Sequence, residues 1–188
     1  MVNAIVMASG LSKRMGENKL LLKYKDIPLV EHILREIKKC DFNEVILVSQ
    51  YEEILQLGKR YNFKIVKNEN SHVGQSESIK LGINNSSDCD GYMFFVGDQP
   101  KLKSEHINTI MNTFKHNKDY IIIPKSNNKC GNPVIFPYKI KEELLLLKHD
   151  EKGKKVINNN SSILYVNIDE DILFDIDTKS DYDKLRGE

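Results

Sequence analysis

The sequence of 188 residues contains no tryptophan and only three cysteines, which lie far apart. Cys40, Cys89 and Cys130 form no Cys-x-x-Cys pair and no cluster with histidine, so neither a disulfide framework nor a structural zinc site is supported. This use of cysteine is typical of a reducing compartment, and we expect a cytoplasmic protein.

Long hydrophobic runs and an excess of one charge are lacking as well. The formal net charge is +1, with 29% charged and 40% hydrophobic residues, which is the composition of a folded globular chain. A charge so close to zero provides no general attraction to nucleic acid or anionic lipid. The N-terminal apolar stretch is too short for a signal peptide or a membrane span. We expect one domain over residues 1–188, without a nucleic-acid or membrane partner.

Short apolar runs alternate with amphipathic segments along the chain, and those runs are typical of strands buried on both faces. The pattern predicts a three-layer α/β fold with a largely parallel sheet. Ser104 is the expected N-cap of its helix, and Asp177 or Thr178 that of the last one. Strands are predicted at 4–8, 45–48, 63–66, 92–96, 120–123, 134–136 and 163–168, and helices at 28–39, 52–61, 76–83, 104–115, 139–147, 152–159 and 181–186.

Ligands of such sheets bind beyond the carboxyl ends of the strands, and the loops at 9–19, 73–76 and 97–101 follow strands there. In the first loop, Ala8, Ser9 and Gly10 allow backbone amides to approach an anion. Arg14 and Lys19 add positive charge that suits phosphate. The spacing fits neither a P-loop nor a dinucleotide fingerprint, and a plain strand–loop–helix connection is the alternative.

Two further strings contain carboxylates that suit a metal. Asp98 ends a strand in the string Gly-Asp-Gln-Pro, which favours a Mg²⁺ ligand, although aspartate is also common in turns. Asp175 and Asp177 would share a face if their segment is extended, so either is a candidate second ligand. The alternative is that this segment only begins the last helix.

A weaker signal lies at Gly74, Gln75 and Ser76, which open a helix whose free amides and side chains are suited to a base or ribose. The five histidines have no spacing typical of a catalytic triad or a metal site, and we assign them no role.

In this order the strings resemble the nucleotidyltransferase family that includes the molybdenum cofactor cytidylyltransferases. The resemblance rests on ASGLSKRMG at 8–16 followed by Lys19, on Gly74-Gln75-Ser76, on Gly97-Asp98-Gln99-Pro100 and on the Asp-x-Asp-Thr string at 175–178. It spans nearly the whole chain, and it implies a three-layer α/β/α, Rossmann-like nucleotidyltransferase fold with a mostly parallel mixed sheet.

The resemblance also implies a reaction. CTP would bind at Ala8, Ser9, Gly10, Arg14, Lys19, Gly74, Gln75 and Ser76. Mg²⁺ would be held by Asp98 and Asp177, with Arg14, Lys19 and Asp98 as the catalytic residues. The terminal phosphate of molybdopterin would attack the α-phosphorus and release pyrophosphate. A molybdenum hydroxylase is the implied partner.

Base and acceptor follow from finer details. Ala-Ser-Gly resembles the Ala-Ala-Gly of the cytidylyl branch more than the Ala-Gly-Gly of the guanylyl branch, and a side chain at Ser9 should disfavour a purine. The family's Gly-His-Pro is Gly131-Asn132-Pro133 here, and Lys152–Lys155 replaces an arginine-bearing segment. Alternatives are therefore another base, a sugar-phosphate acceptor, or a non-catalytic cofactor chaperone for a molybdenum hydroxylase.

Overall fold

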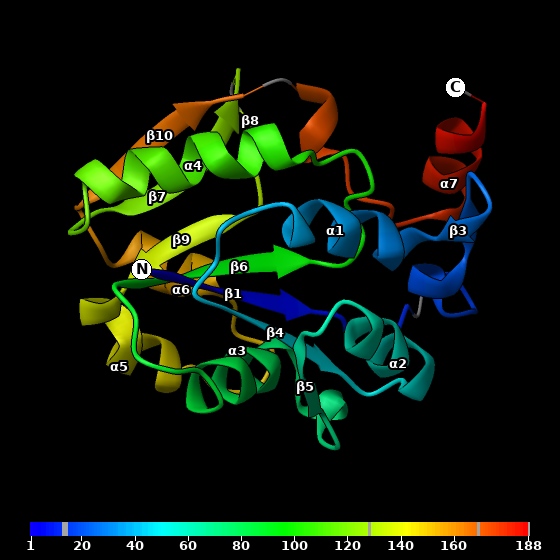
Figure 1. The fold of residues 1–188 in the computed structure, drawn as a ribbon, viewed down its shortest axis with the longest axis horizontal. Helices are drawn as coiled ribbons and strands as arrows, with labels where there is room; N and C mark the ends of the chain where they lie inside the picture. Colours follow the sequence, from blue (N-terminus) through cyan, green and yellow to red (C-terminus); the bar gives the residue numbers. More distant parts are fainter. Residues whose placement is uncertain (13–14, 128, 169, 188) are drawn as a thin grey trace.

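A mixed sheet of eight strands forms the middle layer of the protein (Figure 1). The computed structural model describes residues 1–12, 15–127, 129–168 and 170–187. Across the sheet the strand order is β10-β7-β9-β6-β1-β4-β5, with β8 paired to β7. The strands are β1 (Val2–Met7), β4 (Glu44–Ser49), β5 (Lys64–Lys67), β6 (Gly91–Val96), β7 (Ile121–Ser126), β8 (Lys129–Cys130), β9 (Val134–Pro137) and β10 (Ile163–Asn167).

The sheet is parallel at its centre, where β1 lies between β4 and β6. Ile5 pairs with Ile46 on one side and with Phe94 on the other. β9 is antiparallel to both of its neighbours, β6 and β7. The predicted three-layer α/β fold with a mostly parallel mixed sheet is therefore confirmed.

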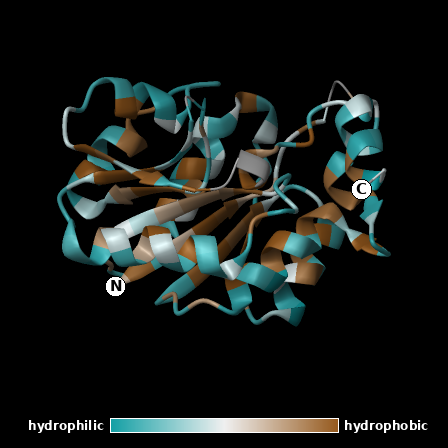
Figure 2. Ribbon diagram, turned by 90° about the horizontal axis from the view of Figure 1, so that it is seen from above, coloured by the Kyte–Doolittle hydropathy of each residue, from teal (hydrophilic) through white to brown (hydrophobic). Residues whose placement is uncertain are grey.

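Alternation along the strands divides the interior into two cores, one on each face of the sheet. Val6 and Phe95 join the core on one face, and Ile5 and Phe94 join the other. Figure 2 shows the hydrophobic sheet between helices whose outer surfaces are hydrophilic. Because both faces are covered at the centre of the sheet, the central strands β1, β4 and β6 are apolar at nearly every position, which is why they could be recognised.

The helices are distributed over the two faces. Residues of α1 (Leu29–Lys38), α2 (Glu52–Arg60) and α4 (Ser104–His116) pack into the first core. Residues of α3 (Gln75–Asn84), α5 (Lys141–Leu145) and α6 (Gly153–Asn158) pack into the second. The segment predicted as one helix at 139–147 is divided into a 3₁₀ turn, Tyr138–Ile140, and α5.

A small lobe at one end of the sheet was not predicted in full. It consists of the hairpin β2 (Lys23–Tyr24) and β3 (Ile27–Pro28) and the last helix, α7 (Lys179–Arg186). Leu29, Ile176 and Leu185 form its buried core. Of the two predicted caps of α7, Asp177 and Thr178, the structure has Thr178. Its hydroxyl accepts a hydrogen bond from the Asp181 amide.

The predicted cap at Ser104 is wrong, because the N-cap position of α4 is Lys103 and Ser104 is the first helical residue. The Ser104 amide donates to the Glu36 carboxylate of α1, with N to Oε2 at 3.0 Å. A carboxylate from another helix thus satisfies one of the free amides at the start of α4, and a local sequence pattern does not contain this information.

Among the residues that the structure describes, no helix has the length and apolar character needed to cross a bilayer.

We predict that Glu36→Gln lowers the free energy of unfolding by about 1 kcal/mol at pH 7, the usual loss for a helix cap. Burial alone would raise the pKa of Glu36, but the hydrogen bonds from Lys39 and Ser104 outweigh it and hold the pKa below its ordinary value of 4.5. The stabilisation is therefore complete above that value and is lost as the pH falls through the lowered pKa. Urea unfolding of both proteins between pH 3 and pH 7 measures the difference.

The control is Glu69→Gln, which alters an exposed ion pair with Lys67 at 3.8 Å. We expect a change within about 0.5 kcal/mol there. Equal losses in the two variants, or a Glu36 effect that persists unchanged at pH 3, would contradict the proposed capping.

Candidate active site

A cleft of about 1260 Å³ opens at the carboxyl ends of the central strands. Its lining includes residues 9–12 after β1, residues 73–75 before and at the start of α3, and residues 97–98 after β6. The three loops selected from the sequence therefore meet in one place, as predicted. Because these loops are held by the ends of neighbouring parallel strands, the sheet fixes their positions relative to one another.

The first loop is anchored through its backbone carbonyls. The Ala8 carbonyl accepts a hydrogen bond from Ser49 Oγ at 2.8 Å, and the Ser9 carbonyl accepts one from Gln50 Nε2 at 2.8 Å. The Gly10 carbonyl accepts a hydrogen bond from the Tyr51 hydroxyl at 3.1 Å. In a trans peptide the next N–H points opposite to the carbonyl, so the amides that follow face away from these anchors. This orientation suits an anion-binding loop.

The same loop continues into a 3₁₀ turn, Lys19–Leu21, that places Lys19. The Asn18 side chain accepts from the Leu20 amide, and Ser12 Oγ accepts from the Lys19 amide at 3.2 Å. The Lys19 side chain consequently extends into the cleft and is only 12% exposed. Arg14, the other cation predicted in this loop, lies outside the described residues.

Lys19 joins the two aspartates predicted as metal ligands. Its Nζ donates to Asp98 Oδ2 at 2.5 Å and to Asp177 Oδ1 at 3.0 Å. Burial alone would lower the pKa of Lys19, but the charges and hydrogen bonds of Asp98 and Asp177 outweigh it and raise the pKa above its ordinary value. The structure thus brings Lys19, Asp98 and Asp177 together, and the Lys19 ammonium is charged at neutral pH.

Asp98 is firmly placed but incompletely bonded. Its backbone carbonyl accepts a hydrogen bond from the Ile176 amide at 3.1 Å, which ties the C-terminal segment to the end of β6. Within the described part of the chain, Asp98 Oδ1 is buried and has no hydrogen-bond partner. A buried carboxylate oxygen without a partner is costly, so this atom points to a missing cation or donor.

Asp175, the other candidate at this string, lies in the same cleft but has a different partner. Its Oδ1 accepts from Gln99 Nε2 at 2.8 Å, and Gln99 is almost fully buried. Burial, followed by the negative charge of Asp98, raises the pKa of Asp175 to about 6. The sequence alone predicts no role for Gln99, although its place directly after Asp98 is a usable signal.

The string at residues 74–76 is divided between the cleft and the interior. Gly74 and Gln75 line the cleft, and Gln75 Nε2 lies 3.7 Å from Met7 Sδ. Ser76 is fully buried and donates from Oγ to the His149 carbonyl at 2.6 Å. The Ser76 hydroxyl therefore attaches α3 to the loop before α6.

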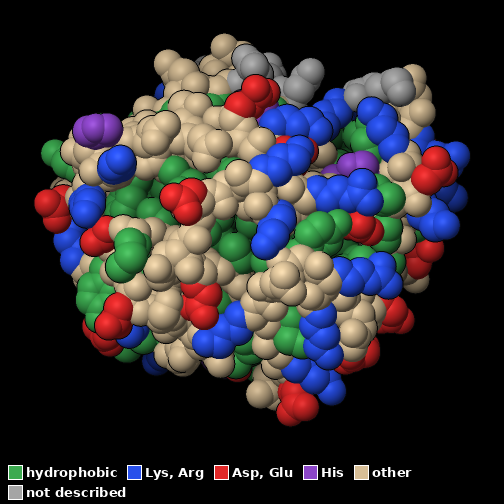
Figure 3. All heavy atoms as spheres, viewed as in Figure 1, with side chains coloured by type: hydrophobic (Ala, Val, Ile, Leu, Met, Phe, Trp, Pro, Cys, Tyr) green, Lys and Arg blue, Asp and Glu red, His purple; other side chains and the backbone are tan. Residues whose placement is uncertain are grey.

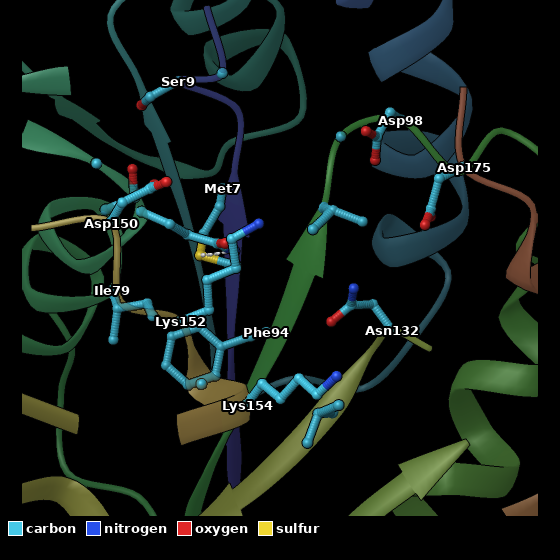
Figure 4. A pocket seen from close by; sticks show the side chains of 18 of the residues that line it. Met7, Ser9, Ile79, Phe94, Asp98, Asn132, Asp150, Lys152, Lys154 and Asp175 are labelled. Carbon is cyan, nitrogen blue, oxygen red and sulfur yellow. Dashed lines mark hydrogen bonds between the residues drawn. The ribbon is translucent and has the colours of Figure 1, made fainter. Parts of the chain in front are cut away.

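The far half of the cleft has a different chemistry. Figure 4 shows Asp98 and Asp175 on one side, with Asn132, Phe94 and Lys154 farther along the cleft. Phe94 packs edge-on against Phe136 with ring centroids 5.8 Å apart, which forms part of an apolar floor. Lys152 and Lys154 also line the cleft and add positive charge to it. In the sequence, Asn132 and these lysines are recognisable only as departures from a family pattern.

A second hollow of about 550 Å³ lies beside α1. Figure 3 shows lysine and arginine side chains gathered over this region. Arg35 pairs with Glu31 at 3.0 Å, and Lys39 pairs with Glu36 at 2.8 Å. Two of the cations of this hollow are thus paired within their own helix, and the large cleft, where the three loops after the strands meet, is the stronger candidate for an anionic ligand.

Within the described residues, no group of three or more His, Cys, Asp or Glu side chains has the arrangement of a metal site. Any metal in the cleft would therefore have few protein ligands. That is the usual situation for Mg²⁺, which retains water and phosphate oxygens in most of its positions.

Comparisons with known proteins agree with the fold. Residues 4–163 match the family of MobA-like NTP transferase domains. A probable molybdenum cofactor guanylyltransferase of Natranaerobius thermophilus is 32% identical over 125 residues, which cover 65% of this chain and 60% of that protein. Another protein of that name, from Thermococcus sibiricus, is 25% identical over 192 residues. The match covers 97% of this chain and 96% of that protein.

Solved structures resemble the whole chain. Rv0371c from Mycobacterium tuberculosis H37Rv superposes with a TM-score of 0.84 at 22% identity, covering 100% of this chain and 97% of that one. A structure of Rv0371c in complex with manganese gives a TM-score of 0.81 at 20% identity, with coverage of 100% and 98%. At this level of identity the likeness establishes the fold.

We predict that Gly74→Ala destabilises the protein by about 1–3 kcal/mol, the usual cost of backbone strain. Gly74 has a φ of +127°, and an added Cβ would lie 2.5 Å from the His149 carbonyl oxygen and 2.7 Å from Asp150 Cα. Gly10→Ala is the control, because nothing lies within 4 Å of its added Cβ. Urea unfolding should show a change within about 0.5 kcal/mol for Gly10→Ala. A loss at Gly74 no larger than at Gly10 would contradict the close packing of the loop before α6.

Proposed function

Because the chain belongs to the family of MobA-like NTP transferase domains, we propose that it transfers CMP from CTP to a molybdopterin-type acceptor and releases pyrophosphate. The observation that carries the proposal is the meeting of Lys19, Asp98 and Asp177 beside the anchored loop at 8–12. Two carboxylates and a lysine next to free backbone amides are the groups needed to hold a triphosphate and a divalent metal.

The residues present suit a divalent metal. Asp98 Oδ1 is buried without a partner among the described residues, and Asp98, Asp175 and Asp177 place three carboxylates in one cleft. Asp98 and Asp177 would hold Mg²⁺, as in our reading of the sequence. Bound there, the metal would neutralise charge on phosphate oxygens of the nucleotide. The manganese complex of Rv0371c supports a divalent ion in this fold.

The chain's own residues then position the reactants. The amides after Ala8, Ser9 and Gly10 bind the triphosphate, and Lys19 neutralises part of its charge. An incoming phosphate monoester is already ionised at neutral pH, so its attack on the α-phosphorus requires no general base. Catalysis of this kind depends mainly on positioning and on charge stabilisation.

The size of the cleft supports two substrates. Its volume of about 1260 Å³ exceeds the roughly 300–1,000 Å³ typical of a site for one small molecule. The far half, lined by Phe94, Phe136, Lys152 and Lys154, offers an apolar surface for a flat ring and cations for a phosphate. We assign this half to the acceptor.

The choice of base rests on Ser9. Its side chain lines the cleft and is held at the β1–β4 end, with Oγ 3.4 Å from the Val48 carbonyl. A side chain at this position leaves less room for a purine than glycine would. The relatives described above are named guanylyltransferases, so GTP is the competing substrate that the experiment must include.

We predict that CTP with Mg²⁺ raises the melting temperature by a few degrees, whereas GTP, ATP and UTP do not. A ligand present at a hundred times its dissociation constant stabilises the folded state by about 2.7 kcal/mol. Thermal unfolding with each nucleotide, with and without Mg²⁺, makes this comparison. A shift with GTP alone would move the protein to the guanylyl branch, and no shift with any nucleotide would overturn the transferase proposal.

We further predict that Asp98→Asn lowers pyrophosphate release by about 10²–10³-fold while the circular dichroism spectrum is unchanged. The neutral amide of asparagine cannot balance the charge of a metal ion, and it weakens the interaction with the Lys19 ammonium. Asp119→Asn is the matched control, since Asp119 forms an exposed pair with Lys139 at 3.2 Å. The measurement uses CTP and a molybdopterin acceptor. Full activity of Asp98→Asn would refute the assigned role of this carboxylate.

A further inference from the structure

We propose that Lys19 is the resident counter-ion of Asp98 and Asp177, and that it excludes a divalent metal from this pair until the phosphates of a nucleotide draw it away. The inference rests on the proposed function only in taking Asp98 and Asp177 as the metal ligands. Metal and nucleotide then bind interdependently, because Lys19 can pair either with the two aspartates or with the nucleotide phosphates, but not with both.

The exclusion follows from the contacts of one atom. Lys19 Nζ binds Asp98 Oδ2 at 2.5 Å and Asp177 Oδ1 at 3.0 Å, so it lies where a metal shared by these oxygens would have to be placed. Mg²⁺ binds carboxylate oxygens at about 2.0–2.1 Å, so a metal that bridged these two oxygens would take the position between them that the ammonium holds. Metal and ammonium therefore compete for the pair.

The competitor is held strongly enough to matter. The side chains of Lys19 and Asp98 are 12% and 16% exposed, so their charges are poorly screened by solvent. Hydrogen bonds between charged groups are the strong ones in proteins. A metal that bridges Asp98 and Asp177 in the nucleotide-free protein must displace Lys19 from both, whereas the unpartnered Asp98 Oδ1 by itself offers a metal only one carboxylate.

The Lys19 side chain can also bind a nucleotide phosphate on the neighbouring loop. Its backbone is fixed by Ser12 and by the 3₁₀ turn Lys19–Leu21, but the side chain is a flexible four-carbon stem. The anchored loop at 8–12 lines the same cleft as the carboxylates. A triphosphate on that loop offers Lys19 new anionic oxygens, and its transfer there leaves the aspartates to the metal.

Thermodynamic linkage gives the consequence. If nucleotide binding removes Lys19 from the pair, it raises the affinity for metal, and metal must raise the affinity for nucleotide by the same factor. The nucleotide-free protein would thus be a weak metal binder even though its carboxylates are already assembled.

The test measures Mn²⁺ binding to the nucleotide-free full chain by electron paramagnetic resonance. Lys19→Met removes the competing charge and should tighten Mn²⁺ binding about tenfold, equal to about 1.4 kcal/mol. Lys129→Met is the matched control. Lys129 lines the same cleft and acts electrostatically on Asp175, but its Nζ donates to the Leu173 carbonyl at 3.1 Å. We expect less than a threefold change for this variant. Unchanged affinity in Lys19→Met, or an equal gain in Lys129→Met, would overturn direct competition.

A second measurement uses the wild-type protein, in case Lys19→Met fails to fold. Lysines are acylated with a water-soluble reagent and the products are measured by mass spectrometry. Acylation of Lys19 should be slow without metal and several-fold faster with saturating Mn²⁺. An unchanged rate at saturation would overturn the displacement. Neither experiment contains nucleotide or acceptor, so failure of the proposed transferase activity and failure of this inference are separately visible.

Discussion

The contact on which the site depends is the ammonium of Lys19 between two aspartates. Asp98 is 79 residues away from it in the sequence and Asp177 is 158 residues away. The three residues come from the loop after β1, the end of β6 and the segment before α7. Because like charges repel, Asp98 and Asp177 can approach one another in a partly buried cleft only if a cation compensates them. Lys19 supplies that cation and thereby joins the beginning, the middle and the end of the chain.

The sheet provides the rigid frame for this contact. β1 and β6 are neighbours and parallel, so their following loops leave the same edge. β9 is antiparallel to β6, and the residues before it, including Asn132, enter the cleft from the opposite direction. One half of the cleft is consequently built from parallel strand ends and the other from the antiparallel insertion. This division matches the different chemistry of the two halves.

The sequence contained most of the architecture because buried strands are apolar on both faces, and the runs around Ile5 and Phe94 could not be mistaken for surface. It also contained Lys19 and Asp98, whose short strings follow predicted strands. Long-range contacts were not readable: Glu36 caps α4 from another helix, and Ser76 bonds a carbonyl that is distant in sequence. The hairpin β2–β3 is too short to produce an alternation pattern. The sequence does not distinguish the surroundings of Asp175 from those of Asp177. In the structure they differ, because Asp175 accepts a hydrogen bond from Gln99 and Asp177 accepts one from Lys19.

The lobe around Leu29, Ile176 and Leu185 gives the site a dependence on local stability. Asp177 is carried by the segment that enters α7, and the match to the family ends earlier, at residue 163. A short helix that packs through a small separate core opens more often than the central sheet does, with a free energy well below that of global unfolding. Each opening of α7 would withdraw one carboxylate from the cleft without disturbing the sheet. The fraction of molecules able to bind a triphosphate is then set by how well three apolar side chains hold the segment that contains Asp177. Natural variation at Leu185 would change activity without touching a substrate.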